Sequence, residues 1–214
     1  MKLINASYEI MTPINAKDIY QMLEKAGRTC YKSEDKITEE SAEKFVRAIV
    51  KRGHEAMLEH ASLTVRFIVD RGVSHELVRH RIASFAQEST RYCNYSQDKF
   101  GNELTFIRPA WHIDFPGYVV WHEAMKNAEK AYFDMLASGC TPEEARSVLP
   151  NSLKTEVIMT CNLREMRHFL KLRAAGITGK PHPQMLEVTI PLLNELREKL
   201  PAIFEDILPM EETK

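Results

Sequence analysis

The stretch 153–173 has the sequence LKTEVIMTCNLREMRHFLKLR, in which a strand pattern leads directly into a helix pattern. Its first part, Leu153–Thr160, is predicted to be a strand. In the part that follows, Asn162 stands three positions before Glu165, which is the spacing of a capping box at the start of a helix. We expect this helix to end near Arg173. The stretch therefore predicts a fold that contains both strands and helices.

Similar patterns along the rest of the chain predict further elements of both kinds. Helices are expected at Asn15–Ala26, Thr38–Lys51, Ser74–Ser84, Gly117–Ser138 and Pro183–Lys199, and another is expected to begin at the capping box of Thr141 and Glu144. Strands are expected at Met1–Thr12 and Ala61–Asp70, and Ser89–Tyr95 and Glu103–Arg108 are predicted to be loop or strand. The expected fold is α+β, mostly helical, with a small mixed or antiparallel sheet.

The length and charge of the chain limit its organisation and its partners. The chain has 214 residues and no Pro/Gly/Ser-rich linker, low-complexity tract or internal repeat, so residues 1–214 are expected to form a single domain. The formal net charge is −1, from 29 basic and 30 acidic residues, so no overall attraction to nucleic acid or acidic membranes is expected. Binding of an anion must therefore depend on local placement of basic residues.

Several locations and binding modes are disfavoured by the sequence. No segment has the roughly 20 apolar residues of a membrane helix, and the first residues lack the apolar region of a signal peptide. The four cysteines form neither a CxxC pair nor a zinc-like spacing, so a reduced, cytoplasmic setting and no metal site are expected. The chain contains no G-x-G-x-x-G or Walker loop, so a bound dinucleotide would not use either of these.

The segment Arg79–Tyr92 concentrates basic and hydroxyl side chains. Its sequence is RHRIASFAQESTRY, in which Glu88 is the only acid. Such a cluster suits phosphate and planar carbonyl ligands, because guanidinium offers a rigid fork of donors. On the predicted helix Arg81 falls within an apolar arc, whereas Arg79 and His80 point elsewhere, so the three side chains cannot all contact one partner. The alternative is a surface helix whose arginine stems cover apolar neighbours.

The helix predicted after Asn162 also has an arginine at an unusual place. Its apolar arc consists of Leu163, Met166, Phe169, Leu170 and Leu172, and its opposite side of Arg164, Arg167, His168 and Lys171. Arg173 projects into the apolar arc, where a desolvated guanidinium is costly without a counter-charge. Two explanations are open: the helix ends before Arg173 and leaves it solvated, or Arg173 is held for an anionic or carbonyl ligand.

Several ordered pieces of the chain together resemble flavin-dependent thymidylate synthases. They are Arg28–Tyr31, the His-then-Glu-His element at Gly53–His60, the Arg-His-Arg…Ser…Arg-Tyr pattern at Arg79–Tyr92, the arginine helix at Gly139–Pro150, the Asn-Leu-Arg…Leu-Arg motif at Asn162–Arg173, and the His-x-Gln at His182–Gln184. The pieces span most of the chain. The chain departs from the family at Ala86 and Gln87, where the family usually has Asn-Glu, and at Ala56, where a hydroxyl is common.

The resemblance implies a reaction and an assembly. It implies an FAD-dependent thymidylate synthase, a methyltransferase that makes dTMP from dUMP, takes its one-carbon unit from the folate 5,10-methylenetetrahydrofolate, and uses NADPH to reduce the flavin. It also implies the thymidylate synthase-complementing type of fold. The implied assembly is a homotetramer whose active sites are shared between subunits.

The resemblance further assigns roles to individual residues. It assigns flavin contacts to Ala56, Glu59, Arg79, His80, Arg81, Gln87, Asn162, Leu163, Arg164 and His168. It assigns dUMP contacts, some from a second subunit, to Glu76, Leu77, Val78, Arg79, Gln87, Glu88, Ser89, Thr90, Arg91, Arg146 and Arg173. Arg173 is assigned the catalytic role of ionising N3 of the pyrimidine. This agrees with the chemistry, because a cation in a dry pocket stabilises the enolate-like charge that makes C5 nucleophilic.

Two other functions are open from the sequence alone. A nucleic-acid-binding module could use the two arginine-rich helices, and it would bind oligonucleotides in a salt-sensitive way. The near-zero net charge and the placement of Arg173 among apolar residues count against this alternative. A homologue that kept the fold and lost its activity is also open, because Ala86 and Gln87 replace the usual Asn-Glu pair.

Overall fold

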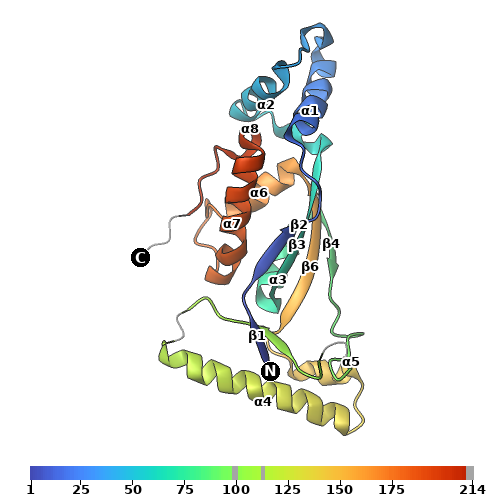
Figure 1. Ribbon diagram of the computed structural model, residues 1–214, viewed down its shortest axis with the longest axis vertical. Coiled ribbons are helices and arrows are strands. Elements are labelled where there is room, and N and C mark those ends of the chain that lie inside the picture. Colours follow the sequence, from blue (N-terminus) through green and yellow to red (C-terminus); the bar gives the residue numbers. More distant parts are fainter. Residues whose placement is uncertain (98–100, 112–113, 211–214) are drawn as a thin grey trace. The chain divides into compact units, whose positions relative to one another are not determined.

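The computed structural model describes residues 1–97, 101–111 and 114–210 (Figure 1). The chain divides into two compact units. Unit 1 consists of Met1–Ser7, Phe67–Arg79 and Phe85–Ile158, and unit 2 of Tyr8–Arg66, His80–Ser84 and Met159–Lys214. The chain passes between the units several times, so neither unit is a continuous segment.

Four strands form one sheet in the order β2–β3–β6–β4. They are β2 (Ser7–Ile10), β3 (Ser62–Asp70), β6 (Lys154–Asn162) and β4 (Ala83–Gln87). Alternate residues of β3 and β6 are buried, which is the pattern of strands with one face toward a core. The strands predicted at Ala61–Asp70 and Leu153–Thr160 are therefore confirmed, and the strand predicted at Met1–Thr12 is divided into β1 (Lys2–Ile4) and β2.

Unit 1 contains a parallel strand pair and a long helix. β1 pairs in parallel with β5 (Thr105–Ile107), and α4 (Pro116–Ala137) packs against α5 (Pro142–Ala145) and η4 (Arg146–Val148). A cluster of buried side chains forms its core, namely Tyr95, Leu104, Phe106, Met125, Tyr132, Ala145 and Leu153. The predicted capping box at the start of α5 is confirmed, because the side chains of Thr141 and Glu144 each accept a hydrogen bond from the other residue's amide.

Unit 2 is mostly helical. Its helices are α1 (Ala16–Tyr31), α2 (Ser41–Lys51), α6 (Leu163–Arg173), α7 (Pro183–Lys199) and α8 (Pro201–Phe204), and its short turns are η1 (Glu34–Lys36) and η2 (Glu55–His60). α1 packs beside α2 (Figure 1). α7 contacts both α6 and α8, and η2 contacts α6. The helices predicted at Asn15–Ala26, Thr38–Lys51 and Pro183–Lys199 are confirmed, although the first continues to Tyr31 and the second begins at Ser41.

The helix predicted at Ser74–Ser84 is wrong in its second half. α3 (Arg71–Leu77) is capped by Asp70 and ends at Leu77, and β4 begins at Ala83. Ile82 belongs to the apolar arc of the predicted helix, yet 71% of its surface is exposed. The apolar residues of such a short segment fit a helical and an alternating pattern equally well, and pairing of β4 with β6 decides between them.

The predicted fold class is confirmed as a mixture of helices and strands in which helices predominate. Within the described parts of the chain, no helix combines the length and the hydropathy that crossing a membrane requires.

Candidate active site

The residues predicted to contact flavin or dUMP are distributed over both units. Those in unit 2 are Ala56, Glu59, His80, Arg81, Asn162, Leu163, Arg164, His168 and Arg173. Those in unit 1 are Glu76, Leu77, Val78, Arg79, Gln87, Glu88, Ser89, Thr90, Arg91 and Arg146. Most flavin candidates therefore lie in unit 2, and most dUMP candidates lie in unit 1.

Helix α6 carries five of the candidates of unit 2 on itself or at its cap. The Asn162 side chain accepts a hydrogen bond from the Glu165 amide at 2.9 Å, which starts the helix where the sequence predicts it. The helix extends to Arg173 as its last residue, and that side chain is partly buried. Of the two explanations for Arg173, an earlier helix end is therefore excluded.

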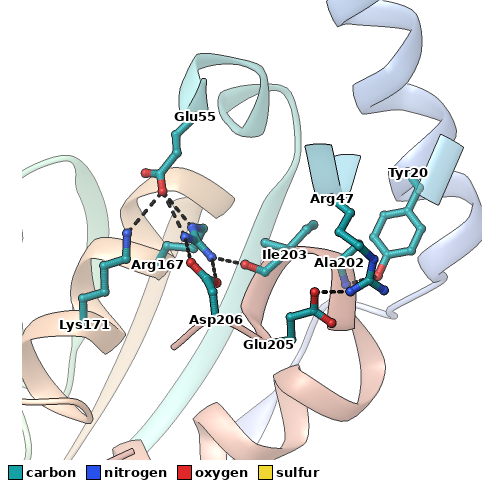
Figure 2. A network of polar contacts seen from close by, with 9 residues as sticks. All are labelled: Tyr20, Arg47, Glu55, Arg167, Lys171, Ala202, Ile203, Glu205 and Asp206. Carbon is teal, nitrogen blue, oxygen red and sulfur yellow. Dashed lines mark hydrogen bonds and ion pairs between the residues drawn. The ribbon is translucent and has the colours of Figure 1, made fainter. Parts of the chain in front are cut away.

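Arg167 corrects the predicted polar side of this helix. It is expected on the solvent-exposed side, but only 1% of its surface is exposed. Its guanidinium donates two hydrogen bonds of 2.7 Å to the Asp206 carboxylate, one of 3.0 Å from Nε to Glu55, and one to the carbonyl of Ile203 (Figure 2). Lys171 also donates to Glu55, at 3.2 Å. Each donor of this buried cation thus has an anionic or carbonyl partner, as the burial of a charge requires.

The Arg167 network joins three segments that are distant in sequence. Arg167 lies on α6, Glu55 begins η2, and Asp206 lies two residues after the end of α8. One face of η2 is thereby held against α6. Because η2 carries Ala56 and Glu59, the network fixes these two flavin candidates relative to those on α6. No sequence pattern predicts the roles of Glu55 and Asp206, because nothing in the sequence distinguishes them from the other acidic residues.

A second ion pair, at the surface, joins η2 to α6. The Arg164 Nη1 donates to Glu59 at 2.5 Å, and the two side chains are 53% and 46% exposed. His168, one turn further along α6, is exposed as well. Two accessible donors therefore stand on successive turns of one helix, with a carboxylate beside them. Such a donor set fits an anionic ligand that also presents hydrogen-bond donors.

His80 is buried between the side chains of α6. Its Nδ1 lies 3.2 Å from Glu165 Oε1, and Arg173 Nε donates toward its Nε2 at 3.4 Å. Its ring packs edge-on against Phe169 and His168. Desolvation by burial lowers the pKa of His80, against the opposing effect of Glu165, and the charges of Arg173 and His168 lower it further. The imidazole is therefore neutral near pH 7.

The side chains of the three consecutive basic residues Arg79, His80 and Arg81 point in different directions, as the sequence predicts, although they do not lie on a helix. His80 points into the interior of unit 2, while Arg79 and Arg81 on either side are exposed. Arg81 is therefore not part of a buried apolar arc, which corrects its predicted place. The turn between α3 and β4 leaves both guanidinium groups accessible to a ligand.

Unit 1 holds the second half of that segment in a network of its own. Gln87 Nε2 donates to Ser74 Oγ at 2.9 Å and to Thr155 Oγ1 at 3.3 Å. Ser89 Oγ accepts from the Arg91 amide at 3.3 Å, and the Arg91 side chain lies 3.1 Å from Glu143. Gln87 is thus oriented by hydroxyl groups and needs no charge to remain in place.

A pocket of about 370 Å³ lies beside Gln87. It is lined by Ala86, Gln87, Glu88, Cys93, Lys154, Glu156 and Ile158. Within it Lys154 Nζ donates to Glu88 at 2.9 Å and to Glu156 at 2.5 Å. Tyr95, which is not part of the lining, also donates to Glu88, at 3.0 Å. Burial acts to lower the pKa of Lys154, but the two carboxylates outweigh it and raise that pKa. The ammonium is therefore charged, and it neutralises Glu88, the only acid of the Arg79–Tyr92 segment.

The remaining dUMP candidates of unit 1 differ in accessibility. Leu77 is fully buried and Thr90 is nearly so, whereas Val78 and Arg146 are exposed. Leu77 thus contributes to the core, and a ligand contact of its side chain is not available in this arrangement. Arg146 begins η4 at the end of α5, where the helix started by Thr141 ends.

One group of side chains has the composition of a metal site. The potential ligand atoms of His80, Glu165 and His168 all lie within 4.8 Å of one another. However, the Nε2 of His80 lies 3.4 Å from Nε of Arg173. A permanently charged guanidinium so close to the group repels a metal ion. The group therefore fits a hydrogen-bond chain better than a metal centre.

Comparisons with known proteins point to one family. The model of the family described as "Thymidylate synthase complementing protein" matches residues 14–202. A flavin-dependent thymidylate synthase of Geobacter sulfurreducens is 33% identical over 199 residues, which cover 86% of this chain and 80% of that protein. One of Pyrococcus furiosus is 34% identical over 188 residues, which cover 86% of this chain and 72% of that protein.

A solved structure supports the same relationship. The UMP/dUMP methylase PolB from Streptomyces cacaoi, bound with 5-Br dUMP, superposes with a TM-score of 0.78 at 25% sequence identity. The superposition covers 96% of this chain and 96% of that chain. The similarity therefore extends over almost all of the fold.

The Arg167 network leads to a prediction about stability. Replacing Asp206→Ala removes two hydrogen bonds from a buried guanidinium and is expected to lower the free energy of unfolding by about 1–3 kcal/mol. Glu205→Ala is the matched control, because the neighbouring Glu205 is similarly exposed but pairs with the exposed Arg47 (Figure 2). It is expected to lower the free energy by at most about 1 kcal/mol. Urea unfolding of both variants measures the difference, and equal losses would contradict this role of Arg167.

The same network predicts a pH dependence of stability. Burial acts to raise the pKa of Asp206, but the hydrogen bonds and charge of Arg167 outweigh it, so that pKa is lowered. A lowered folded-state pKa means that the contribution is complete above the unfolded-state value of about 3.9 and is lost as the pH falls through the folded-state pKa. The stability difference between the wild type and Asp206→Ala should therefore shrink at acidic pH. A difference that stays constant down to the acid unfolding of the protein would show that the ion pair is not its source.

Proposed function

Because this chain belongs to the thymidylate synthase complementing protein family, we propose that it converts dUMP to dTMP as a flavin-dependent thymidylate synthase. The observation that carries this proposal is the match of the family model to residues 14–202, which include every candidate site residue. The PolB structure supports the nucleotide as substrate, since that protein is bound with a brominated dUMP. We propose that residues 1–214 act as one catalytic domain of a cytoplasmic enzyme.

In the proposed reaction a one-carbon unit passes from 5,10-methylenetetrahydrofolate to C5 of dUMP and is reduced to a methyl group. When bound, FAD would supply the hydride for this reduction, with NADPH as the source of reducing equivalents. The residues of the chain then have three tasks: to hold the cofactor, to hold the nucleotide, and to make C5 nucleophilic.

Among the residues proposed to hold FAD, the exposed polar side chains fit the group by their chemistry, whereas the side chains of His80 and Leu163 are buried. In unit 2 they are Ala56, Glu59, His80, Arg81, Asn162, Leu163, Arg164 and His168, and in unit 1 they are Arg79 and Gln87. The exposed guanidinium of Arg164 and the imidazole of His168 offer donors for a diphosphate or a ring carbonyl. The bracing of η2 by Arg167 supports this assignment, because it holds Glu59 within reach of Arg164.

Arg173 is proposed to act on the pyrimidine. A guanidinium in a partly buried position stabilises negative charge that develops on N3 and O4, and this charge makes C5 electron-rich enough to attack the one-carbon donor. His80 beside it is neutral, so it can accept the hydrogen bond of Arg173 and does not repel the guanidinium. Substrate activation by this route needs no cysteine nucleophile. In agreement, burial raises the pKa of Cys161, the cysteine nearest in sequence to α6, to about 12, so its thiol is protonated.

The other dUMP contacts are proposed to come from Glu76–Arg79, from Gln87–Arg91 of a second subunit, and from Arg146. A homotetramer with shared active sites would bring these residues together with Arg173. The exposure of Arg79 and Arg81 on both sides of the buried His80 supports such sharing, because the two guanidinium groups are available to different partners.

Turnover is the direct test of this function. Purified protein supplied with FAD, NADPH, methylenetetrahydrofolate and dUMP is expected to form dTMP. Arg173→Ala is expected to lower kcat by at least about 100-fold, the effect of removing one donor from a developing negative charge, while the assembly stays intact. Arg47→Ala, which changes an exposed arginine of α2 without an assigned role, is the control. Normal turnover by Arg173→Ala would refute its role, and tight, salt-sensitive oligonucleotide binding without any turnover would favour a nucleic-acid-binding module.

Cofactor binding can be tested separately from turnover. Arg164→Gln removes an exposed cation from the proposed flavin contacts and is expected to weaken FAD binding about tenfold, which corresponds to about 1.4 kcal/mol. Arg47→Gln is the matched control in the same unit. Titration of each apoprotein with FAD, followed by flavin fluorescence, gives the dissociation constants. Equal affinities of the two variants and the wild type would remove Arg164 from the flavin site.

A further inference from the structure

We propose that Glu165 is a positioning residue for the reaction, because through His80 it fixes the direction in which Arg173 presents its guanidinium. The inference rests on the proposed function, since it concerns the arginine that is assigned to the pyrimidine. Neither the sequence motifs nor the comparisons assign a role to Glu165. In the sequence it is recognised only as the acid of a predicted capping box.

The geometry places these three side chains in a chain of contacts. Glu165 Oε1 lies 3.2 Å from His80 Nδ1, and Arg173 Nε lies 3.4 Å from His80 Nε2. Glu165 and His80 are 7% and 5% exposed, so solvent does not replace either contact readily. Glu165 and Arg173 belong to the first and last turns of the same helix, and His80 connects them from the turn before β4.

The chemistry of the three groups allows the two hydrogen bonds to run in one direction only, from Arg173 to His80 and from His80 to Glu165. An ionised carboxylate can only accept, so the hydrogen of the neutral imidazole belongs on Nδ1. Nε2 is then left with its lone pair, and it accepts the Nε–H of Arg173. A histidine with the opposite tautomer would turn an N–H toward the N–H of Arg173 and lose both contacts. Glu165 therefore selects the only tautomer of His80 that can hold the arginine.

The end of the helix is fixed by a second contact of a different kind. Thr189 on α7 donates from its hydroxyl to the Arg173 carbonyl at 2.7 Å. The backbone of Arg173 is thus held by α7, and its guanidinium is held at Nε by His80. Because Nε carries only one hydrogen, this contact does not use the terminal nitrogens, which are the atoms that pair with a pyrimidine carbonyl or an ionised N3.

A purely structural role for Glu165 is the alternative to be distinguished. The groups that face His80 are Glu165, Arg173, His168 and the edge of the Phe169 ring. Burial lowers the pKa of His80, and the Glu165 charge opposes that effect. If His80 acts as an acceptor, activity is lost at acidic pH when it becomes protonated. Removing the Glu165 charge lowers the pKa of His80 further, so the acidic limit of activity must move to lower pH even though the maximal rate falls.

The experiment compares Glu165→Gln with Glu43→Gln, an exposed carboxylate of α2 in the same unit. Glutamine keeps the shape of glutamate, but its amide can also donate to Nδ1 and so admits the wrong tautomer. Glu165→Gln is expected to lower kcat/KM for dUMP by about 10-fold to 100-fold, by analogy with the hydrogen-bonded partners that orient metal-ligating histidines, with the KM for methylenetetrahydrofolate unchanged. The acidic limb of its pH profile should move to lower pH. Wild-type activity, or a loss without a shift of that limb, would overturn the proposal.

A double-mutant cycle tests whether Glu165 acts through His80. In a His80→Gln background, Glu165→Gln should cause little further loss, because the connection is already broken. Additive losses would mean that Glu165 acts independently of His80, and the proposal would be wrong.

A spectroscopic measurement needs neither turnover nor a folded variant. Magic-angle-spinning spectra of wild-type protein labelled with ¹⁵N-histidine report the tautomer of each imidazole, and the proposal requires Nδ1–H for His80 near neutral pH. The Nε2–H form or a charged ring would overturn it. Absence of dTMP formation by the wild type would count against the proposed function instead, and the tautomer of His80 would still decide whether the Glu165–His80–Arg173 chain exists.

Discussion

A guanidinium that is removed from water must be matched by fixed negative charge, and Arg167 imposes this requirement on unit 2. Glu55 and Asp206 supply the charge, and the carbonyl of Ile203 completes the set of acceptors. The three partners come from η2 and from the segment around α8, so the cation can be satisfied only when these segments close on α6. The interaction that stabilises the fold therefore also fixes the distance between two elements that carry half of the flavin candidates.

The sides of helix α6 have different surroundings. Its apolar residues and Arg167 face the interior, while Arg164 and His168 remain accessible. Glu165 and Arg173 stand at opposite ends and meet through His80, which burial keeps neutral. The same helix thus provides a buried support, an accessible polar surface and an oriented cation. A short helix can do this because successive side chains point in different directions around its axis, so residues that are close in sequence meet different neighbours.

The sequence predicts the elements with strong periodicity or clear caps, including α4, α6, α7, β3 and β6, and the capping box at Thr141. It fails where short apolar segments fit two periods, as between Leu77 and Ala83, where pairing in the sheet decides. It also places Arg167 on the polar side of its helix, because helical geometry alone cannot show that Glu55 and Asp206 come from elsewhere to meet it. The candidate residues themselves come from the family resemblance. Glu165 has no signal beyond its capping position, since its partner His80 is remote in sequence.

We propose that polar residues on and beside α6 hold a flavin and that Arg173, the last residue of α6, acts on a deoxyuridylate bound with it. The most direct measurement is the visible absorption spectrum of the FAD-loaded protein during a titration with dUMP. We expect a saturable change in the flavin bands with dUMP and a much weaker change in the Arg173→Ala variant. A protein that takes up no FAD, or whose flavin spectrum does not respond to dUMP at any concentration, would contradict it.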